Sequence, residues 1–337
     1  MIPVFGTGTL CLVCPVCKGA LEYHESPQNK DRGAACCQTC SSWFPAADGS
    51  LNLAEESKRL ADETAFYEGA YAFEHGRKPA RRLDASEWAR RWHDPHWPEC
   101  QRILERLGDV RNKVILCLGN GASVKELYFL HLGAYLIHSD LSLAGVLKAK
   151  AEYDLDGFKG RVAFHAMDAC TIPLPDSSVD IVYGFEFAHH LPDLTPLLRE
   201  VKRVLKEGGR CVFCDNAYSP LWQAAKTTIL WPMMKVAHWL HPISPEDLRA
   251  TYAGGYREEE IQHVGSAVGL GCTHFERVGL FHYLLVRGVG VFVGWNGPQW
   301  VYKAPGTVGR VLDALLTEHV GFLARNRIQL VWGFDKL

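Results

Sequence analysis

A glycine turn between two apolar segments is the sequence feature that most constrains the fold of this chain. Residues Val114–Leu118 are apolar and lead into Gly119 and Gly121, and a second apolar segment, residues 134–137, precedes Asp140. This order predicts a strand, a tight turn, a helix, a second strand and a carboxylate, which is the first half of a nucleotide-binding βαβ unit. Glycines let the backbone approach a ligand closely, and a carboxylate after the second strand suits the two hydroxyl groups of a ribose.

The alternation of strands and helices continues beyond this unit. Residues 164–169 predict a third strand that ends at a second acid, Asp168, and residues 179–184 predict a fourth strand. Residues 197–206 have the apolar spacing of a helix, which two glycines end before a fifth strand at residues 210–214. The chain therefore predicts an α/β fold with a parallel sheet.

In this order, residues 114–216 resemble the class I S-adenosylmethionine (SAM)-dependent methyltransferases, in particular the small-molecule branch that includes the ubiquinone and menaquinone methylases. The resemblance implies a Rossmann-like, doubly wound sheet of seven strands, whose last two strands we expect at residues 273–278 and 284–287. A dehydrogenase would prefer the full G-x-G-x-x-G fingerprint, which is absent here. The residues that the resemblance assigns to SAM are Gly119, Asn120, Gly121, Asp140, Leu141, Asp168, Ala169 and Phe185.

Two positions depart from the pattern of that family. Cys117 stands where the family usually has an acid that helps to hold the methionine end of SAM, and Ser123 stands at the third glycine. We expect SAM to bind with a water, the Ser123 hydroxyl or another side chain in the place of the acid. Because of the same departures, a non-catalytic scaffold protein with the fold of a SAM-binding domain remains an alternative interpretation.

Methyl transfer from a sulfonium ion needs an unprotonated nucleophile in line with the methyl group, so positioning and desolvation supply much of the rate. A hydroxyl or protonated amine acceptor also needs a general base, and His189 and His190 are the best-placed candidates. Alternatively, this pair caps a helix and contacts the cofactor. The residues expected to meet the substrate or to form a lid over it are Phe66, Tyr67, Tyr71, Glu186 and Tyr256.

Two C-x2-C pairs near the start of the chain predict a metal site. Cys14 and Cys17 are separated by nineteen residues from Cys37 and Cys40. Two such pairs supply the four thiolates of a tetrahedral structural Zn²⁺ site, as in a zinc ribbon. Cys11 and Cys36 are spare thiols of which one could replace a neighbour, and an iron–sulfur cluster is the second interpretation.

The composition of the chain limits the binding partners and the cellular location that we expect. The formal net charge of −2 gives no general attraction to nucleic acid. A methylase of RNA bases remains an alternative, because a zinc module ahead of a SAM domain also resembles the ribosomal-RNA guanine methylases. We expect no signal peptide and no transmembrane segment, and hence a cytoplasmic protein, although the apolar residues 221–240 could contact a membrane surface. The oligomeric state is left open.

The expected organisation has four parts. A zinc-ribbon module occupies residues 1–54, and a helical linker or lid occupies residues 55–110. The SAM-binding methyltransferase domain spans residues 111–294, with a helical insertion at about 218–260, and residues 295–337 form a C-terminal extension. The expected activity is methylation of an oxygen, nitrogen or carbon atom of a small metabolite that is aromatic or lipophilic.

Overall fold

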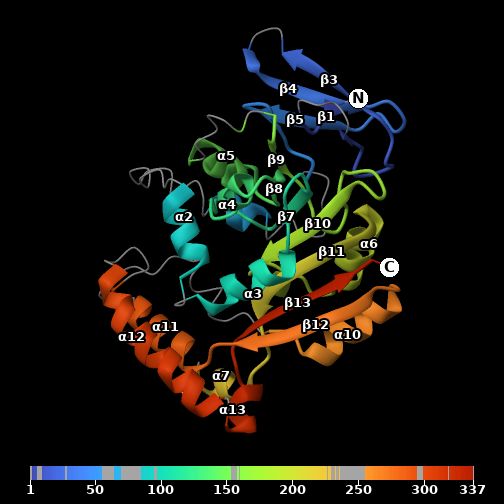
Figure 1. Ribbon diagram of the computed structural model, residues 1–337. Helices are drawn as coiled ribbons and strands as arrows, with labels where there is room; N and C mark the ends of the chain where they lie inside the picture. Colours follow the sequence, from blue (N-terminus) through green and yellow to red (C-terminus); the bar gives the residue numbers. More distant parts are fainter. Residues whose placement is uncertain are drawn as a thin grey trace.

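The computed structural model describes residues 2–5, 10–26, 29–54, 64–69, 85–94, 97–152, 158, 160–225, 227, 228, 232, 235, 255–293, 299–317 and 319–336. Its centre is a sheet of seven strands in the order β12–β13–β11–β10–β7–β8–β9 (Figure 1). The strands are β7 (Val114–Leu118), β8 (Tyr135–Asp140), β9 (Val162–Ala166), β10 (Val179–Phe185), β11 (Leu205–Asn216), β12 (Gly271–Val278) and β13 (Gln329–Asp335).

The direction of the strands defines one functional edge of this sheet. Strands β11, β10, β7, β8 and β9 are parallel, and β13 is antiparallel to both of its neighbours. The carboxyl ends of the parallel strands therefore meet at one edge, where β13 begins, and Asn216 pairs there with Gln329. Ligands of open α/β sheets bind outside this carboxyl edge.

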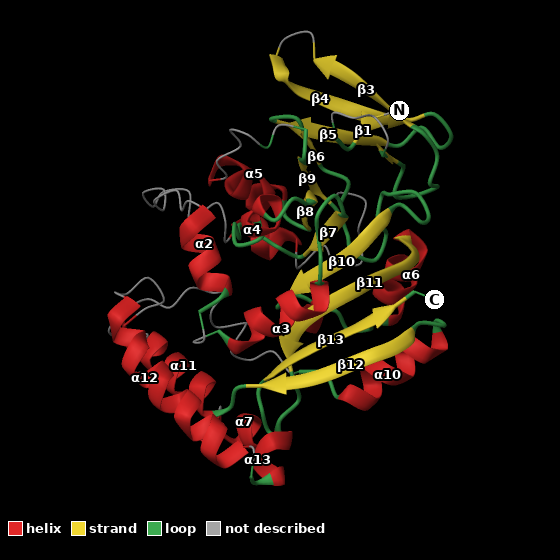
Figure 2. Ribbon diagram, viewed as in Figure 1, coloured by secondary structure: helices red, strands yellow, loops and turns green. Residues whose placement is uncertain are grey.

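Helices cover both faces of the sheet, as Figure 2 shows. Successive strand residues such as Val182 and Tyr183 point to opposite faces, and both are buried because each face is covered. One face packs against α2 (Ala85–Trp92), α3 (Pro98–Leu107), α4 (Leu127–His131) and α5 (Leu143–Glu152). The other face packs against α6 (Thr195–Val204) and α10 (Glu258–Ala267).

The N-terminal module forms two antiparallel sheets of its own, one of two strands and one of four, and lies beside β9 at the top of Figure 1. The Asn52 backbone pairs with Ala166, and the Leu53 N–H donates to the carbonyl of Ala166 at 2.8 Å. The module thus supports the last residue of β9. Its strands are β1 (Ile2–Pro3), β2 (Cys11–Leu12), β3 (Leu21–Ser26), β4 (Asn29–Cys37), β5 (Trp43–Ala47) and β6 (Ser50–Leu51).

The seventh strand lies elsewhere than the sequence predicts. Residues 273–278 form most of β12 as expected, but the prediction of a strand at 284–287 is wrong, because these residues lie within a helix, α11 (Phe281–Val293). Short apolar runs do not distinguish a buried strand from a buried helix by periodicity alone. The strand that completes the sheet is β13, which belongs to the segment 295–337 expected to be an extension.

The remaining described helices lie at the carboxyl edge of the sheet, at the lower left of Figure 1. Much of the expected insertion at 218–260, including residues 236–254, lies outside the described residues. No helix in the described part of the chain is long and apolar enough to cross a membrane. These elements are α7 (Pro220–Ala225), α11, α12 (Gln299–Leu312), η4 (Asp313–Thr317) and α13 (Gly321–Arg325).

Candidate functional site

The turn after β7 has the backbone conformation that glycine permits. Gly119 and Gly121 have φ angles of 63° and 52°, in the left-handed region. A Cβ atom at Gly119 would also lie 2.3 Å from the Cβ of Phe187, so the turn has no room for a side chain. The buried Asn120 donates its backbone N–H to the carbonyl of Ser139 at 3.0 Å, which joins the turn to β8.

Two side chains of β8 are hydrogen-bonded to the backbone of Gly121, one to its N–H and one to its carbonyl. The Asp140 carboxylate accepts the N–H of Gly121 at 2.7 Å and the N–H of Ser142 at 2.9 Å. His138 contacts the Gly121 carbonyl through Nε2 at 3.0 Å, and burial lowers the pKa of His138 to about 4, so a neutral ring donates this bond. Burial raises the pKa of Asp140 to about 6. The predicted ribose acid therefore also fixes the shape of the turn.

The helix of residues 64–69 reaches the same end of β8. The Glu68 carboxylate accepts the Ser142 hydroxyl at 3.0 Å and the N–H of Ala144 at 3.2 Å. Ala144 lies in the first turn of α5, where backbone N–H groups lack partners within the helix. The segment predicted as a lid is thus attached next to Asp140 and Leu141.

The loop after β9 carries the second predicted acid. Asp168 is buried, and its carboxylate accepts the N–H of Cys170 at 2.8 Å, across the predicted adenine contact Ala169. The preceding residue, Met167, donates its N–H to the carbonyl of Asp140 at 2.8 Å. The structure therefore brings Asp140 and Asp168 to adjacent positions on the carboxyl edge.

A buried carboxyl group lies beside Cys117, where the family pattern lacks its acid. Glu126 is fully buried, accepts the Ser123 hydroxyl at 3.1 Å, and has a pKa that burial raises. Its neighbour Lys125 places Nζ 2.9 Å from the ring centroid of the predicted cofactor residue Phe185. The sequence did not reveal Glu126, because this side chain comes from the segment after the glycine turn and only the fold places it beside Cys117.

A histidine–aspartate pair lies at the carboxyl ends of β10 and β11. His189 lies in the short 3-10 turn η2 (Ala188–His190), and its Nδ1 is hydrogen-bonded to the Asp215 carboxylate. The other Asp215 oxygen accepts the His189 backbone N–H at 3.2 Å, and the two side chains are only 3% and 2% exposed. With Nδ1–H donated to Asp215, Nε2 is the basic nitrogen of the ring. Asp215 was missed because one acid after a strand carries no motif.

A predicted lid residue, Tyr67, contacts this turn from the helix of residues 64–69. The Tyr67 hydroxyl lies 3.1 Å from His190 Nε2, and the two rings meet edge to face. Phe66 packs edge to face on Tyr67. The third predicted lid residue, Tyr71, lies outside the described residues.

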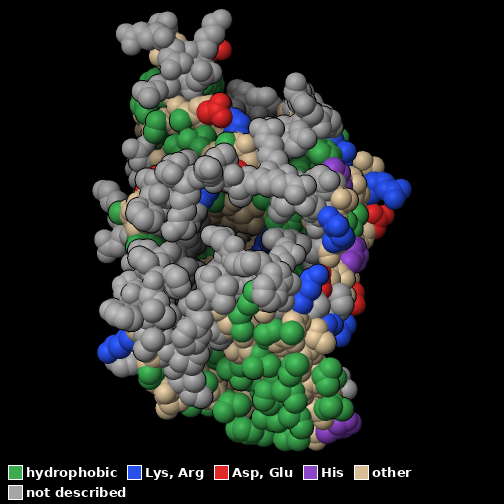
Figure 3. Space-filling view, turned by 90° about the vertical axis from the view of Figure 1, so that its left-hand side faces the viewer, with side chains coloured by type: hydrophobic (Ala, Val, Ile, Leu, Met, Phe, Trp, Pro, Cys, Tyr) green, Lys and Arg blue, Asp and Glu red, His purple; other side chains and the backbone are tan. Residues whose placement is uncertain are grey.

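Tyr256 reaches the same turn from the other side. Its hydroxyl donates to the backbone carbonyls of Ala188 and Leu191, and its own backbone pairs with Ala217 just after β11. Tyr67 and Tyr256 are far apart in the sequence, yet both contact the histidine turn. Figure 3 shows that the molecule is hollowed on the side of this carboxyl edge.

Two further glutamates lie near the carboxyl end of β10. Glu186 follows β10 with a φ of 53°, and Gln329 of β13 donates to its carboxylate at 2.8 Å. Glu99, in the first turn of α3, is 1% exposed. Burial, with a smaller contribution from the charge of Glu186, raises the pKa of Glu99 to about 7. Glu99 is a buried acid that the sequence did not single out.

Glu99 is expected to make stability depend on pH near neutrality. Because its folded pKa lies above the value of 4.5 for an exposed glutamate, its protonated form stabilises the fold below pH 4.5, and this contribution is lost as the pH rises through about 7. We expect Glu99→Gln to raise the free energy of unfolding at pH 8 by about 2–3 kcal/mol, with no gain at pH 4.5. Urea denaturation at both pH values measures this difference.

The control is Glu105→Gln on the same helix, whose side chain is 60% exposed and forms an ion pair with Arg102. That variant should leave the pH dependence unchanged. Equal pH dependence in the wild type and Glu99→Gln would refute the assignment of a buried, proton-binding carboxyl group to Glu99.

The N-terminal module brings four cysteines together. The sulfur atoms of Cys14, Cys17, Cys37 and Cys40 all lie within 4.8 Å of one another, and the spare thiols of Cys11 and Cys36 are outside this group. Each pair begins a tight turn: Lys18 N–H donates to the Cys14 carbonyl at 2.9 Å and Ser41 N–H to the Cys37 carbonyl at 3.0 Å. Four convergent thiolates fit a closed tetrahedral Zn²⁺ site.

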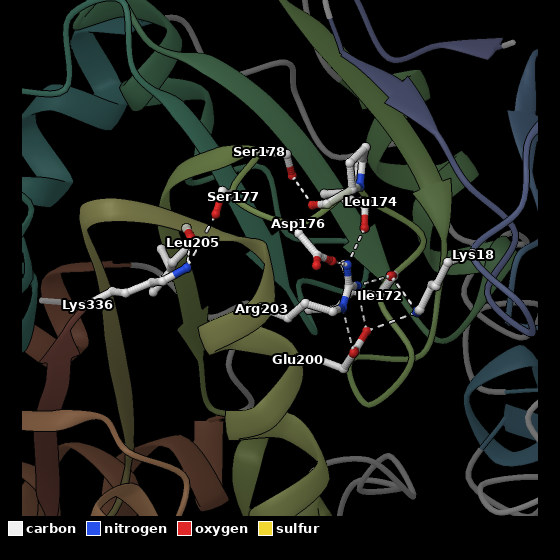
Figure 4. Close-up of polar contacts among 11 residues, drawn as sticks. Lys18, Ile172, Leu174, Asp176, Ser177, Ser178, Glu200, Arg203, Leu205 and Lys336 are labelled. Atoms are coloured by element: carbon white, nitrogen blue, oxygen red, sulfur yellow. Dashed lines mark hydrogen bonds and ion pairs between the residues drawn. The ribbon is translucent and has the colours of Figure 1, made fainter.

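A polar network joins the N-terminal module to the loop that contains Asp168 (Figure 4). Lys18, which follows Cys17 with a φ of 59°, donates Nζ to the Ile172 carbonyl at 3.0 Å and to Glu200 at 3.1 Å. Arg203 donates to the same carbonyl and to the same carboxylate, each at 2.8 Å. The first cysteine turn therefore contacts α6 and the loop after β9 directly.

Comparison with known proteins assigns a class to the centre of this structure. Residues 116–213, which include strands β8, β9 and β10 and parts of β7 and β11, match the family described as a methyltransferase domain. This confirms the predicted likeness to SAM-dependent methyltransferases for the part of the chain that carries the glycine turn, Asp140 and the histidine turn.

Individual relatives are similar over limited regions. The chain is 44% identical over 60 residues to 27-O-demethylrifamycin SV methyltransferase of Amycolatopsis mediterranei, which covers 18% of this chain and 22% of the relative. It is 31% identical over 121 residues to demethylmenaquinone methyltransferase of Streptomyces griseus, which covers 36% of this chain and 50% of the relative. The chain thus spans about half or less of the length of these relatives.

Solved structures include geranyl diphosphate C-methyltransferase of Streptomyces coelicolor A3(2), in complex with Mg²⁺, geranyl diphosphate and S-adenosylhomocysteine. It superposes with a TM-score of 0.49 at 12% identity, over 77% of this chain and 86% of that one.

Proposed function

We propose that this chain transfers a methyl group from SAM to a small lipophilic molecule, and that the acceptor carries a hydroxyl group. The observation that carries the proposal is the arrangement of one sheet edge. The Gly119–Gly121 turn after β7 is bonded to Asp140 at the end of β8, and the buried His189–Asp215 pair lies at the carboxyl ends of β10 and β11. The histidine pair suits an acceptor that must lose a proton, and this favours oxygen over the nitrogen and carbon alternatives.

The cofactor side is assigned to residues that the structure brings to the ends of β7, β8 and β9. The backbone of Gly119 and Gly121 would approach the cofactor closely, the Asp140 carboxylate would hold the ribose, and Asp168 and Ala169 would contact the adenine. Glu126 is our candidate for the acid that Cys117 lacks, because its carboxylate lies beside the same turn. Bound SAM supplies the electrophilic methyl group on its sulfonium ion.

The acceptor side is assigned to the histidine turn and its neighbours. His189 Nε2 takes the proton of the acceptor, and Asp215 holds Nδ1–H so that the basic nitrogen stays correctly oriented. Tyr67 and Tyr256 fix the turn, and together with Phe66 they exclude water from the reacting groups. The names of the relatives above, which concern a menaquinone precursor and a rifamycin, support a large lipophilic acceptor.

The N-terminal module is proposed to bind one structural Zn²⁺ through Cys14, Cys17, Cys37 and Cys40. Its role is to stabilise residues 1–54 and, through Lys18 and Asn52, the loop after β9. A closed set of four thiolates leaves no open position for catalysis. The net charge of −2 remains unfavourable for the alternative RNA substrate.

Methyl transfer from radiolabelled SAM into a panel of hydroquinones, phenols and macrocyclic alcohols tests the proposal. With an acceptor in hand, His189→Ala is expected to lower kcat by about 10²–10⁴-fold while the Kd for S-adenosylhomocysteine stays within about twofold. Asp215→Asn should also lower kcat and change the pH profile of the rate, because it disturbs the orientation and basicity of His189.

The control is His263→Ala, which changes an exposed histidine of α10 on the face of the sheet covered by α6 and α10. Equal kcat in His189→Ala and His263→Ala would refute the general base. Transfer only to RNA would favour the alternative substrate class, and a folded protein that binds no S-adenosylhomocysteine would favour the scaffold alternative.

A further inference from the structure

The C-terminal helices expose an unusual concentration of large hydrophobic side chains. Eleven large hydrophobic residues are exposed among the described residues, and seven of them belong to the stretch from α11 to α13. Figure 3 shows hydrophobic side chains gathered over this lower part of the molecule, beneath the hollow at the carboxyl edge. We call this set the C-terminal apolar surface: Leu285, Val308, Val311, Leu315, Leu316, Val320 and Phe322.

The side of α12 that faces away from the C-terminal apolar surface packs against α11. A Cβ atom at Gly309 would lie 2.4 Å from the Cα of His282, so the two helices touch there, backbone against backbone. Val308, Val311 and Leu315 follow one another at helical spacing, and they are 53%, 51% and 59% exposed. On the adjoining helix α13, Phe322 is 63% exposed. Monomeric soluble proteins rarely expose a contiguous apolar patch of this kind without a binding role.

Among the described residues, the exposed charged side chains of α12 and α13 are cationic. Lys303 of α12 and Arg325 of α13 are exposed, and Arg310 is half-buried. The acid described in this region, Asp313, is turned inward, where its carboxylate accepts backbone N–H groups at the start of α11, including those of Leu280 at 2.9 Å and Phe281 at 2.8 Å. The described rim of the apolar surface is therefore cationic.

We propose that the C-terminal apolar surface docks onto the surface of an anionic lipid bilayer. An apolar helical face with a cationic rim suits the interface, because the side chains enter the boundary between headgroups and acyl chains while the cations meet lipid phosphates. A symmetric dimer through the same patch would instead place Lys303 and Arg325 against the cations of a second copy. The proposed contact is peripheral, with the exposed side chains of α12 and α13 entering only the interface.

This surface differs from residues 221–240, where the sequence suggested a membrane contact. It lies on the same side of the molecule as the hollow in Figure 3. Docking there would hold the carboxyl edge close to lipophilic molecules dissolved in the bilayer.

The test is co-sedimentation of the full chain with phosphatidylcholine vesicles, with and without phosphatidylglycerol, in the absence of SAM. The wild type is expected to bind the anionic vesicles, and more weakly at high ionic strength. The triple variant Val311→Ser, Leu315→Ser, Phe322→Ser should bind them at least about tenfold more weakly. The matched control is Leu132→Ser, which removes an exposed leucine from the C-terminal end of α4.

The proposal is supported if the triple variant loses binding to anionic vesicles while Leu132→Ser retains it. Both variants must also keep the wild-type Tm and circular dichroism spectrum. Three results would overturn it. These are no vesicle binding by the wild type, equal binding by the wild type and the triple variant, or a wild-type dimer that binds no vesicles and that the triple variant converts to monomers. The readout does not use methyl transfer, so it is independent of the proposed activity.

Discussion

Asp140→Ala is expected to weaken the binding of S-adenosylhomocysteine by at least about 100-fold. The variant removes a carboxylate that accepts two backbone N–H groups, from Gly121 at 2.7 Å and from Ser142 at 2.9 Å, and that is our candidate for the ribose contact. Each charge-assisted hydrogen bond between this carboxylate and a ribose hydroxyl would contribute about 1.5–3 kcal/mol to binding. Every 1.4 kcal/mol changes the affinity tenfold. Isothermal titration calorimetry measures the loss without any knowledge of the acceptor.

Two further variants separate the ligand contact from the shape of the turn. Asp140→Asn keeps one side-chain oxygen as an acceptor, so its Kd should lie between those of the wild type and Asp140→Ala. The control is Asp335→Asn, because Asp335 lies at the opposite edge of the same sheet. This variant should bind S-adenosylhomocysteine like the wild type. An unchanged Kd in Asp140→Ala would exclude the carboxylate from the cofactor site and with it the present placement of the ribose.

Cys37→Ser is expected to reduce the zinc content of the protein from about one ion per chain to nearly none. Structural zinc sites contribute about 10–16 kcal/mol of binding free energy in isolated zinc-finger peptides, and much of that energy is folding energy. We therefore expect the module of residues 1–54 to become sensitive to proteases. Elemental analysis and limited proteolysis measure the two effects.

The neighbouring thiol provides the control for this prediction. Cys36→Ser should retain zinc, because Cys36 lies outside the group of four sulfur atoms within 4.8 Å of one another. Loss of zinc in Cys36→Ser but not in Cys37→Ser would reassign the ligand. Iron and acid-labile sulfide in place of zinc would identify the alternative iron–sulfur cluster.

The effect of Cys37→Ser on cofactor binding shows whether the N-terminal module supports the cofactor site or folds independently of it. The Lys18 contacts with Ile172 and Glu200 and the Asn52–Ala166 pairing join the module to the loop that carries Asp168. We therefore expect Cys37→Ser to weaken the binding of S-adenosylhomocysteine as well as to lose metal.

The sequence determined those parts of the protein whose signals are local. The glycine turn, Asp140 and Asp168 were predicted at the ends of three consecutive strands, because each apolar run and the acid after it are close together in the chain. The spacing of the cysteine pairs also predicted the cluster of four sulfur atoms, because each pair forms its own tight turn. Local geometry is enough for such features, and the structure confirms their positions.

Only the tertiary structure decided which distant residues share a site. Asp215 meets His189, and Glu126 lies beside Cys117, because parallel strands and the segments that follow them converge on one sheet edge. The last strand, β13, joins the sheet only after the helices α11 and α12, so an apolar run at 284–287 was mistaken for it. The exposed face of α12 likewise depends on Gly309 packing against α11. These features follow from contacts between segments far apart in the chain, which residue patterns within a short window do not encode.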